Sequence, residues 1–223
     1  MHVHPASASP ARPPREQSYP LPARFLDLFL DPGALFEELR LRPRVTGALA
    51  LSSTVYLAAL GTAWVTREPS HAGALANASP AVLAAGAIAG LVGLWSYLLA
   101  AALLGLAFGG FVGRDLPYRS WLALSAHCSL VAAAVVPIEM ALATLMGSDL
   151  PQPDLAELLR VDAHAVTGAF LARLSLRSAA FLGLFSAGAA AFSGVSFAKA
   201  LAFFAGTWSG LWFALAWFIA GIA

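Results

Sequence analysis

The sequence predicts an all-α membrane protein, a polytopic bundle of five transmembrane helices preceded by a short amphipathic helix. Three observations predict this class. Of the 223 residues, 59% are hydrophobic and only 11% are charged, whereas in soluble domains roughly a quarter are charged. The charged residues gather in short clusters along the chain. The uncharged intervals between those clusters are close to the ~20 residues that a helix needs to cross a bilayer.

Charge and motif content argue against two other classes of protein. The net charge of +1 provides no basic field to attract phosphates, so we expect no nucleic-acid partner. No His-Glu-x-x-His spacing, no nucleophile elbow and no phosphate-binding glycine loop occurs in the sequence. We therefore expect no enzymatic activity and no metal or other cofactor. Cys128, the single cysteine, lies among apolar residues, where a thiol is usually a packing element.

The N-terminal part is predicted to hold a tail and one helix. Residues 1–23 contain six prolines and little that would form a core, which indicates a disordered cytoplasmic tail. Residues 24–44 form the amphipathic helix, with Asp31 as N-cap, Pro32 at the first helical position and Pro43 as its stop. Its apolar face is made of Leu35, Phe36 and Leu39. Such a helix would lie on the lipid headgroups, bind a soluble partner, or do both.

Five apolar segments follow within residues 45–222. The predicted spans are 45–65, 82–108, 121–145, 178–195 and 200–222. The second lies in an uncharged run of 34 residues, Pro80–Gly113, which is too long for one crossing and too short for two. We expect one helix there, frayed through Gly109, Gly110 and Gly113. Ser193, Gly194 and Ser196 predict a tight turn between the last two spans.

The distribution of Lys and Arg predicts the orientation of the spans. With the N-terminus inside the cell, nine of these residues fall on the cytoplasmic side and four on the outer side. Five spans then place the C-terminus outside. Twelve arginines against one lysine are typical of GC-rich bacterial genomes. We therefore expect a multi-pass protein of the cell (inner) membrane.

The third span, 121–145, carries the candidates for a chemical role, namely His127, Cys128 and Glu139. On one helix His127 and Glu139 are about 18 Å apart along the axis and about 120° apart around it, so they cannot pair with each other. Counted from the cytoplasmic end, Glu139 falls about 27 Å along the axis, near the outer edge of a ~30 Å core. His127 is then the deeper polar group.

Other residues in the spans predict helix packing and anchoring. The pairs with small-xxx-small spacing, which lets helix backbones approach, are Gly86–Gly90, Gly105–Gly109 and Gly109–Gly113. The aromatic residues near predicted interfaces are Trp64, Tyr118 and Trp121. We expect them to anchor the helices at the headgroup level.

The assembled pattern resembles the Yip family of polytopic membrane proteins, named for interaction with Ypt/Rab GTPases. Three places over about residues 24–222 carry the resemblance. They are Asp31, Pro32, Phe36, Leu39 and Pro43 before the first span, Gly113–Arg119 leading into a span with Pro137 near its far end, and the closely linked final spans. The resemblance implies five helices and a cytosolic N-terminus. It implies no catalytic residue, and a bacterial chain has no Rab to bind.

Two functions are consistent with these observations. The first is a membrane scaffold or adaptor without catalytic activity, surrounded by the lipid bilayer and binding a cytoplasmic protein through residues 1–44. The alternative is a small-solute or ion transporter or channel, which would use the bundle interior near His127 and Pro137.

Overall fold

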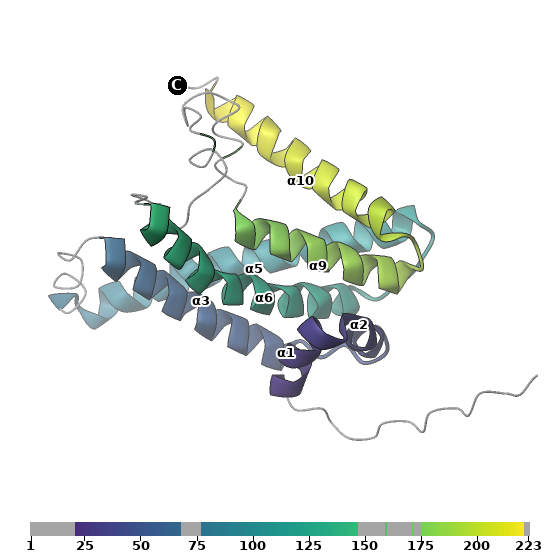
Figure 1. Cartoon of the computed structure of the whole chain (residues 1–223), viewed down its shortest axis with the longest axis horizontal. Coiled ribbons are helices and arrows are strands. Elements are labelled where there is room, and N and C mark those ends of the chain that lie inside the picture. Colours follow the sequence, from purple (N-terminus) through teal and green to yellow (C-terminus); the bar gives the residue numbers. More distant parts are fainter. Residues whose placement is uncertain (1–20, 68–76, 147–158, 160–170, 172–174, 221–223) are drawn as a thin grey trace, which may run out of the picture.

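The computed structural model describes residues 21–67, 77–146, 159, 171 and 175–220 of the chain. The helices are α1 (Leu21–Leu30), α2 (Pro32–Leu41), α3 (Thr46–Arg67), α5 (Pro80–Phe111), α6 (Tyr118–Met146), α9 (Leu176–Ser193) and α10 (Phe197–Ala220). No strand occurs in this part of the chain. The five long helices form an elongated bundle, and α1 and α2 lie at one end of it (Figure 1). The all-α prediction is confirmed.

Three helical segments in the described ranges are long and apolar enough to cross a membrane: Pro80–Phe111, Tyr118–Leu142 and Leu176–Ser193. A shorter apolar segment, Thr46–Ala59, lies in α3. Large apolar side chains on the outer faces of the bundle are exposed, among them Val92, Leu142 and Trp217. An apolar outer surface of this extent suits contact with lipid.

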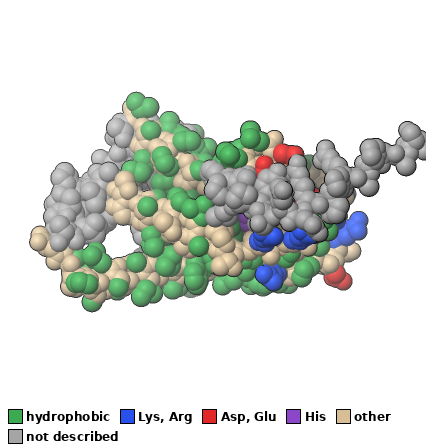
Figure 2. Space-filling view, turned by 90° about the horizontal axis from the view of Figure 1, so that it is seen from below, with side chains coloured by type: hydrophobic (Ala, Val, Ile, Leu, Met, Phe, Trp, Pro, Cys, Tyr) green, Lys and Arg blue, Asp and Glu red, His purple; other side chains and the backbone are tan. Residues whose placement is uncertain are grey.

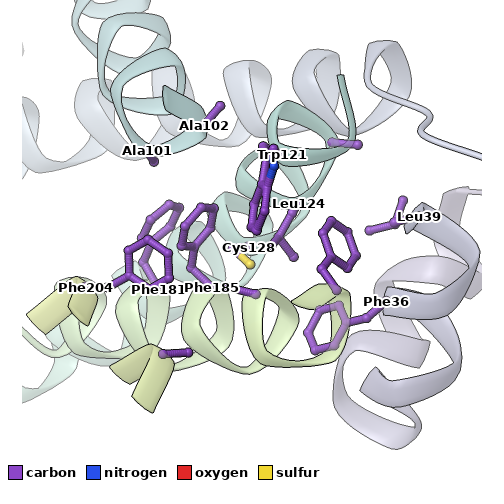
Figure 3. Close-up of a cluster of buried hydrophobic side chains, with 14 of the residues drawn as sticks. Phe36, Leu39, Ala101, Ala102, Trp121, Leu124, Cys128, Phe181, Phe185 and Phe204 are labelled. Atoms are coloured by element: carbon purple, nitrogen blue, oxygen red, sulfur yellow. The ribbon is translucent and has the colours of Figure 1, made fainter. Parts of the chain in front are cut away.

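α6 is the central helix of the bundle. It packs against α3, α5 and α9 along its length, and against α1 and α2 at one end. Trp121, Leu124 and Cys128 point from it into the main apolar core (Figure 3). Cys128 is fully buried there, as its apolar surroundings predict.

Two glycines of α5 leave space for the Trp121 side chain. A Cβ at Gly105 would overlap the Trp121 ring, and a Cβ at Gly109 would lie 3.2 Å from the same ring. Trp121 is therefore fully buried, and the prediction that it anchors the membrane interface is wrong. The predicted fraying at Gly109 and Gly110 is wrong as well, since α5 continues to Phe111.

The other predicted anchors and glycine pairs have different outcomes. Tyr118 is partly buried and packs against the core. The side chain of Trp64 lies outside the described residues. A Cβ at Gly86 would meet nothing within 4 Å, so no close helix contact in the described part of the chain uses that glycine. Gly113 adopts φ +69°, a left-handed conformation that ends the α5 segment.

The N-terminal segment consists of two helices where one was predicted. Because α1 begins at Leu21, the predicted boundary of the tail at residue 23 is wrong by a few residues, and residues 1–20 lie outside the described part. The break falls at Asp31. Its carboxylate accepts a 3.1 Å hydrogen bond from the backbone N–H of Ala34, and Pro32 is the first residue of α2. The predicted N-cap is confirmed. α2 ends at Leu41, two residues before Pro43.

The apolar face of α2 packs on protein. Leu35, Phe36 and Leu39 are each no more than 2% exposed. α2 contacts α9 and α6, and Figure 3 shows Phe36 and Leu39 directed at the end of the bundle. This corrects the expectation that the face lies on lipid headgroups, because the bundle already covers it.

The tight turn between the last two long helices is confirmed. Gly194 caps α9 at φ +67°, and its N–H donates a 2.8 Å hydrogen bond to the Ala190 carbonyl oxygen. From this turn α10 returns along α9 and diverges from it toward its C-terminal end (Figure 1).

Candidate functional site

A cavity of about 260 Å³ lies inside the bundle, and all five long helices line it. Its polar lining residues are Ser52 and Tyr56 of α3, Tyr97 of α5, Ser129 of α6, and Arg177 and Ser178 of α9. On α6 the lining runs from Ser129 to Val136, about 10 Å of helix. A cavity of about 150 Å³ is enough to hold benzene. The space therefore suits a small organic molecule.

One wall of the cavity is aromatic and comes from three helices. Phe181 of α9 meets Tyr97 of α5 edge-on, with ring centroids 4.9 Å apart. Tyr97 meets Trp208 of α10 at 5.4 Å and 88°, and Trp208 meets Trp212 at 5.7 Å and 72°. All four rings line the cavity. They form a continuous apolar surface on which a flat molecule can lie.

A pair of serines connects α3 and α6 at the cavity wall. The Ser129 hydroxyl lies 2.7 Å from the Ser52 hydroxyl oxygen and 2.8 Å from the Ala126 carbonyl oxygen, and Ser52 lies 3.1 Å from the same carbonyl. A hydroxyl donates only one hydrogen. When Ser129 donates to Ser52 and Ser52 to Ala126, both hydrogens are used. The oxygen of Ser129 then keeps acceptor capacity beside the cavity.

Glu139 of α6 fixes the beginning of α9. Its Oε1 accepts a 2.8 Å hydrogen bond from the backbone N–H of Arg177, in the first turn of that helix. Ser175 caps the same turn by accepting from the N–H of Ser178 at 3.2 Å. Amide donors and the helix dipole both favour a negative charge at this position. Arg177 thus lies in a helix terminus whose backbone is fixed by two side-chain hydrogen bonds.

The surroundings of Glu139 differ from those predicted. The side chain is 1% exposed, so protein encloses it and it does not face headgroups. Along α6, Glu139 lies beside the beginning of α9, and therefore near one end of the bundle. Oε2 has no hydrogen-bond partner among the described residues. No local pattern in the sequence could indicate this arrangement, because Arg177 is 38 residues away.

His127 and Pro137 relate differently to the cavity. His127 is fully buried, its Nδ1 lies 2.8 Å from the Ala123 carbonyl oxygen, and it is not a lining residue. Pro137 adjoins the lining residue Val136. Since proline has no N–H, it gives no helical hydrogen bond to the carbonyl of Ala133, which also lines the cavity.

Pro137 does not interrupt α6. α6 runs through this residue as one helix from Tyr118 to Met146. Neighbouring helices support such a proline in a packed bundle. His127 and Glu139, both on α6, hold different partners, the Ala123 carbonyl and the Arg177 N–H. The structure does not make them an acid–base pair.

The family-like motif near the N-terminus has a structural role. Asp31 and Pro32 begin α2, Phe36 and Leu39 bury it on the bundle, and Pro43 lies in the link to α3. None of the five is among the described residues that line the cavity. In the described ranges, no group of three or more His, Cys, Asp or Glu side chains is placed to hold a metal ion.

Sequence reasoning missed most of the cavity residues. Ser52, Tyr97 and Ser129 are single polar residues within apolar spans, and Arg177 counted only as a loop charge. Polar residues inside a span were the available signal, but which of them share a space depends on how five helices face one another.

In the described residues, the fold and the cavity define a class, a helical bundle with helices long and apolar enough to span a membrane, packed around a partly polar cavity. No protein-family model, curated protein or solved structure matches the chain. The resemblance to the Yip family stays a prediction that rests on the sequence motifs.

Proposed function

We propose that this chain is an integral protein of the cell membrane with five membrane-crossing helices, α3, α5, α6, α9 and α10. Three span-length segments and the exposed apolar side chains support this arrangement. The α1–α2 end would face the cytoplasm. Basic side chains gather toward that end of the molecule (Figure 2). Arg40, Arg42 and Arg44 lie at the end of α2 and in its link to α3. Arg114 lies in the α5–α6 link, and Arg119 and Lys199 lie in the first turns of α6 and α10.

The function that the geometry supports best is binding of a small solute inside the bundle, as a transporter or channel does. The cavity of about 260 Å³ carries this proposal, because side chains from all five long helices converge on it. Sites between helices, mostly apolar with a few placed polar groups, are typical of small-molecule binding. The cavity adjoins Pro137 through Val136, and His127 is not among its lining residues in the described part of the chain.

The proposal is tested by filling the cavity. Ala132 and Ala133 line it and are each 7% exposed. Ala132→Phe, and independently Ala133→Leu, should abolish solute-dependent changes in tryptophan fluorescence and solute flux in proteoliposomes. Ala100→Phe, on an exposed face of α5, is the matched control and should keep both signals. Equal binding by the filled variants and the control would exclude the cavity as the site.

A second candidate function is the membrane adaptor, and one observation favours it. The α1–α2 segment leaves four large apolar side chains exposed on its outer side, Leu26, Phe29, Leu30 and Leu41, each at least 55% exposed. These side chains offer an apolar surface to a cytoplasmic protein.

Deleting the whole N-terminal segment would not test the adaptor role cleanly, since α2 is part of the packed bundle. Leu26→Ser with Leu30→Ser should instead reduce the set of proteins crosslinked to the native complex while the bundle stays folded. An unchanged crosslinking pattern would remove this surface from the adaptor proposal.

A further inference from the structure

The serine pair between α3 and α6 presents a hydrogen-bond acceptor to the cavity. Ser129 donates to the Ser52 hydroxyl oxygen at 2.7 Å, and Ser52 donates to the Ala126 carbonyl oxygen at 3.1 Å. A hydroxyl has one hydrogen and two lone pairs. Both hydrogens are therefore engaged within the pair and its carbonyl, and the Ser129 oxygen can still accept a hydrogen bond.

The surroundings of Ser129 keep that oxygen accessible from the cavity. Ser129 is only 6% exposed, yet it lines the cavity. Ala132 and Ala133 follow it by three and four residues on the same face of α6 and line the cavity as well. Their side chains are small, so the space beside the Ser129 oxygen stays open. A hydrogen bond made at such a buried position is stronger than one made in water.

The aromatic wall faces this acceptor from other helices. Tyr97 lies between Phe181 and Trp208, with ring centroids 4.9 Å and 5.4 Å away. α3 packs against α5 and α6, whereas α10 packs against α9 (Figure 1). The serine pair and Trp208 therefore reach the cavity from different sides. A flat ring on the aromatic wall can direct a substituent toward α6.

The size of the cavity limits the ligand. Its volume is about 260 Å³, and ~150 Å³ is enough for benzene. The space thus holds one aromatic ring with a short substituent.

From these features we infer that the cavity binds a small aromatic molecule that carries a hydrogen-bond donor, as a phenol does. Its ring lies on the wall of Tyr97, Phe181 and Trp208, and its O–H or N–H donates to the Oγ of Ser129. This inference rests on the proposed solute-binding function and names the class of solute. It assigns to Ser129 the choice between a donor-bearing ring and an apolar ring of the same shape.

The test uses the full chain in nanodiscs and three matched probes. Phenol carries a donor, toluene has nearly the same shape without one, and anisole has an oxygen that accepts but cannot donate. Isothermal titration calorimetry measures binding, with the heat from empty nanodiscs subtracted. Each probe is compared with itself across variants, which cancels its partition into lipid. Ser129→Ala should weaken phenol binding by about two- to tenfold and leave toluene and anisole nearly unchanged.

Two further serine variants serve as controls. Ser52→Ala removes the hydrogen bond of the pair, but Ser129 can then donate to the Ala126 carbonyl at 2.8 Å and keeps its acceptor oxygen. Phenol binding should therefore persist in Ser52→Ala. Ser125→Ala removes a buried hydroxyl on the same helix that donates to the Leu122 carbonyl and is not among the described lining residues. It should change the binding of none of the three probes.

A variant of the wall tests the place of the ring. Trp208→Leu removes part of the aromatic surface and should weaken phenol, toluene and anisole alike. Unchanged binding of all three in Trp208→Leu would overturn the assignment of the ring to this wall.

The outcomes distinguish this inference from the proposed function. Phenol binding that Ser129→Ala leaves unchanged, or weakens no more than toluene binding, would overturn the role of Ser129. If Ala132→Phe still abolished that binding, the proposed function would stand. Binding of other small solutes but of none of the three probes would likewise overturn the inference alone. Binding of no solute at all would overturn both.

Discussion

The Glu139 carboxylate on α6 accepts a 2.8 Å hydrogen bond from the backbone N–H of Arg177, the second residue of α9. One contact thus connects the central helix to the residue that brings a charge to the cavity. A carboxylate at a helix N-terminus also meets the positive end of the helix dipole, which strengthens the contact. The acidic residue of the third span has a definite task, to hold the beginning of the next long helix.

Removing this contact should destabilise the bundle measurably. In Glu139→Ala the partly buried N–H of Arg177 loses its acceptor, and we expect the free energy of unfolding to fall by about 1–3 kcal/mol. Glu139→Gln keeps an acceptor oxygen and should lose less. Thermal denaturation in detergent compares the variants. Glu37→Ala, which breaks the exposed Glu37–Arg40 pair, is the control and should change stability by no more than about 0.5 kcal/mol. A loss in Glu139→Ala as small as that of the control would contradict the role of the contact.

A second prediction concerns the close approach of α5 to Trp121. A methyl group at Gly105 would overlap the Trp121 ring, and Phe185 lies 3.2 Å from the same position. Gly105→Ala should therefore lower the unfolding free energy by about 1–3 kcal/mol through overpacking. Gly86→Ala, on the same helix with nothing within 4 Å of the added carbon, should be neutral or slightly stabilising. The apparent melting temperatures of the two variants are compared. Equal melting temperatures would contradict the close contact between Gly105 and Trp121.

A third prediction concerns the serine pair between α3 and α6. Ser52→Ala and Ser129→Ala each remove one partner of a 2.7 Å hydrogen bond. Polar contacts between transmembrane helices average about 0.6 kcal/mol in double-mutant cycles. We expect a coupling of that order between the two substitutions, and the double variant should lose less than the sum of the single ones. Strict additivity would show that the hydroxyls act independently.

A fourth prediction concerns the attachment of α2 to the bundle. Phe36 is 2% exposed and Leu41 is 69% exposed on the same helix. Phe36→Ala should destabilise the protein by about 3–5 kcal/mol or release the segment from the bundle, seen as faster backbone hydrogen exchange over residues 21–41. Leu41→Ala should leave exchange unchanged. Fast exchange of this segment in the native chain would contradict the observed packing.

The sequence predicted the helices well because the determinants are local. Asp31 followed by Pro32 begins a helix whatever lies around it, and Gly194 ends one by its left-handed conformation. The environment of a side chain is not local. Trp121 was placed at the membrane interface because of its distance from the end of a span, yet Gly105 and Gly109 on another helix leave it a buried place.

The cavity shows the same limit. Ser52, Tyr97, Ser129 and Arg177 come from four helices, and no spacing within one segment brings them together. Only the three-dimensional packing shows that the charge counted at the edge of the third loop lines the cavity. The transport alternative placed its site near His127 and Pro137. Val136, the neighbour of Pro137, lines the cavity, whereas His127 is buried in the bundle away from the lining.

A fifth prediction concerns orientation. If the α1–α2 end is cytoplasmic, cysteines placed at that end should react with a membrane-impermeant maleimide only after cells are permeabilised. Asp115 and Ser196 are exposed at this end, and Asn77 and Leu176 at the other. The single cysteine of the chain, Cys128, is fully buried and is replaced by alanine as a background. Asn77→Cys and Leu176→Cys should then react on intact cells. Labelling of all four positions from outside, or the reverse pattern, would overturn the proposed orientation. The expected pattern would place Arg177 and its end of the cavity on the outer side of the membrane.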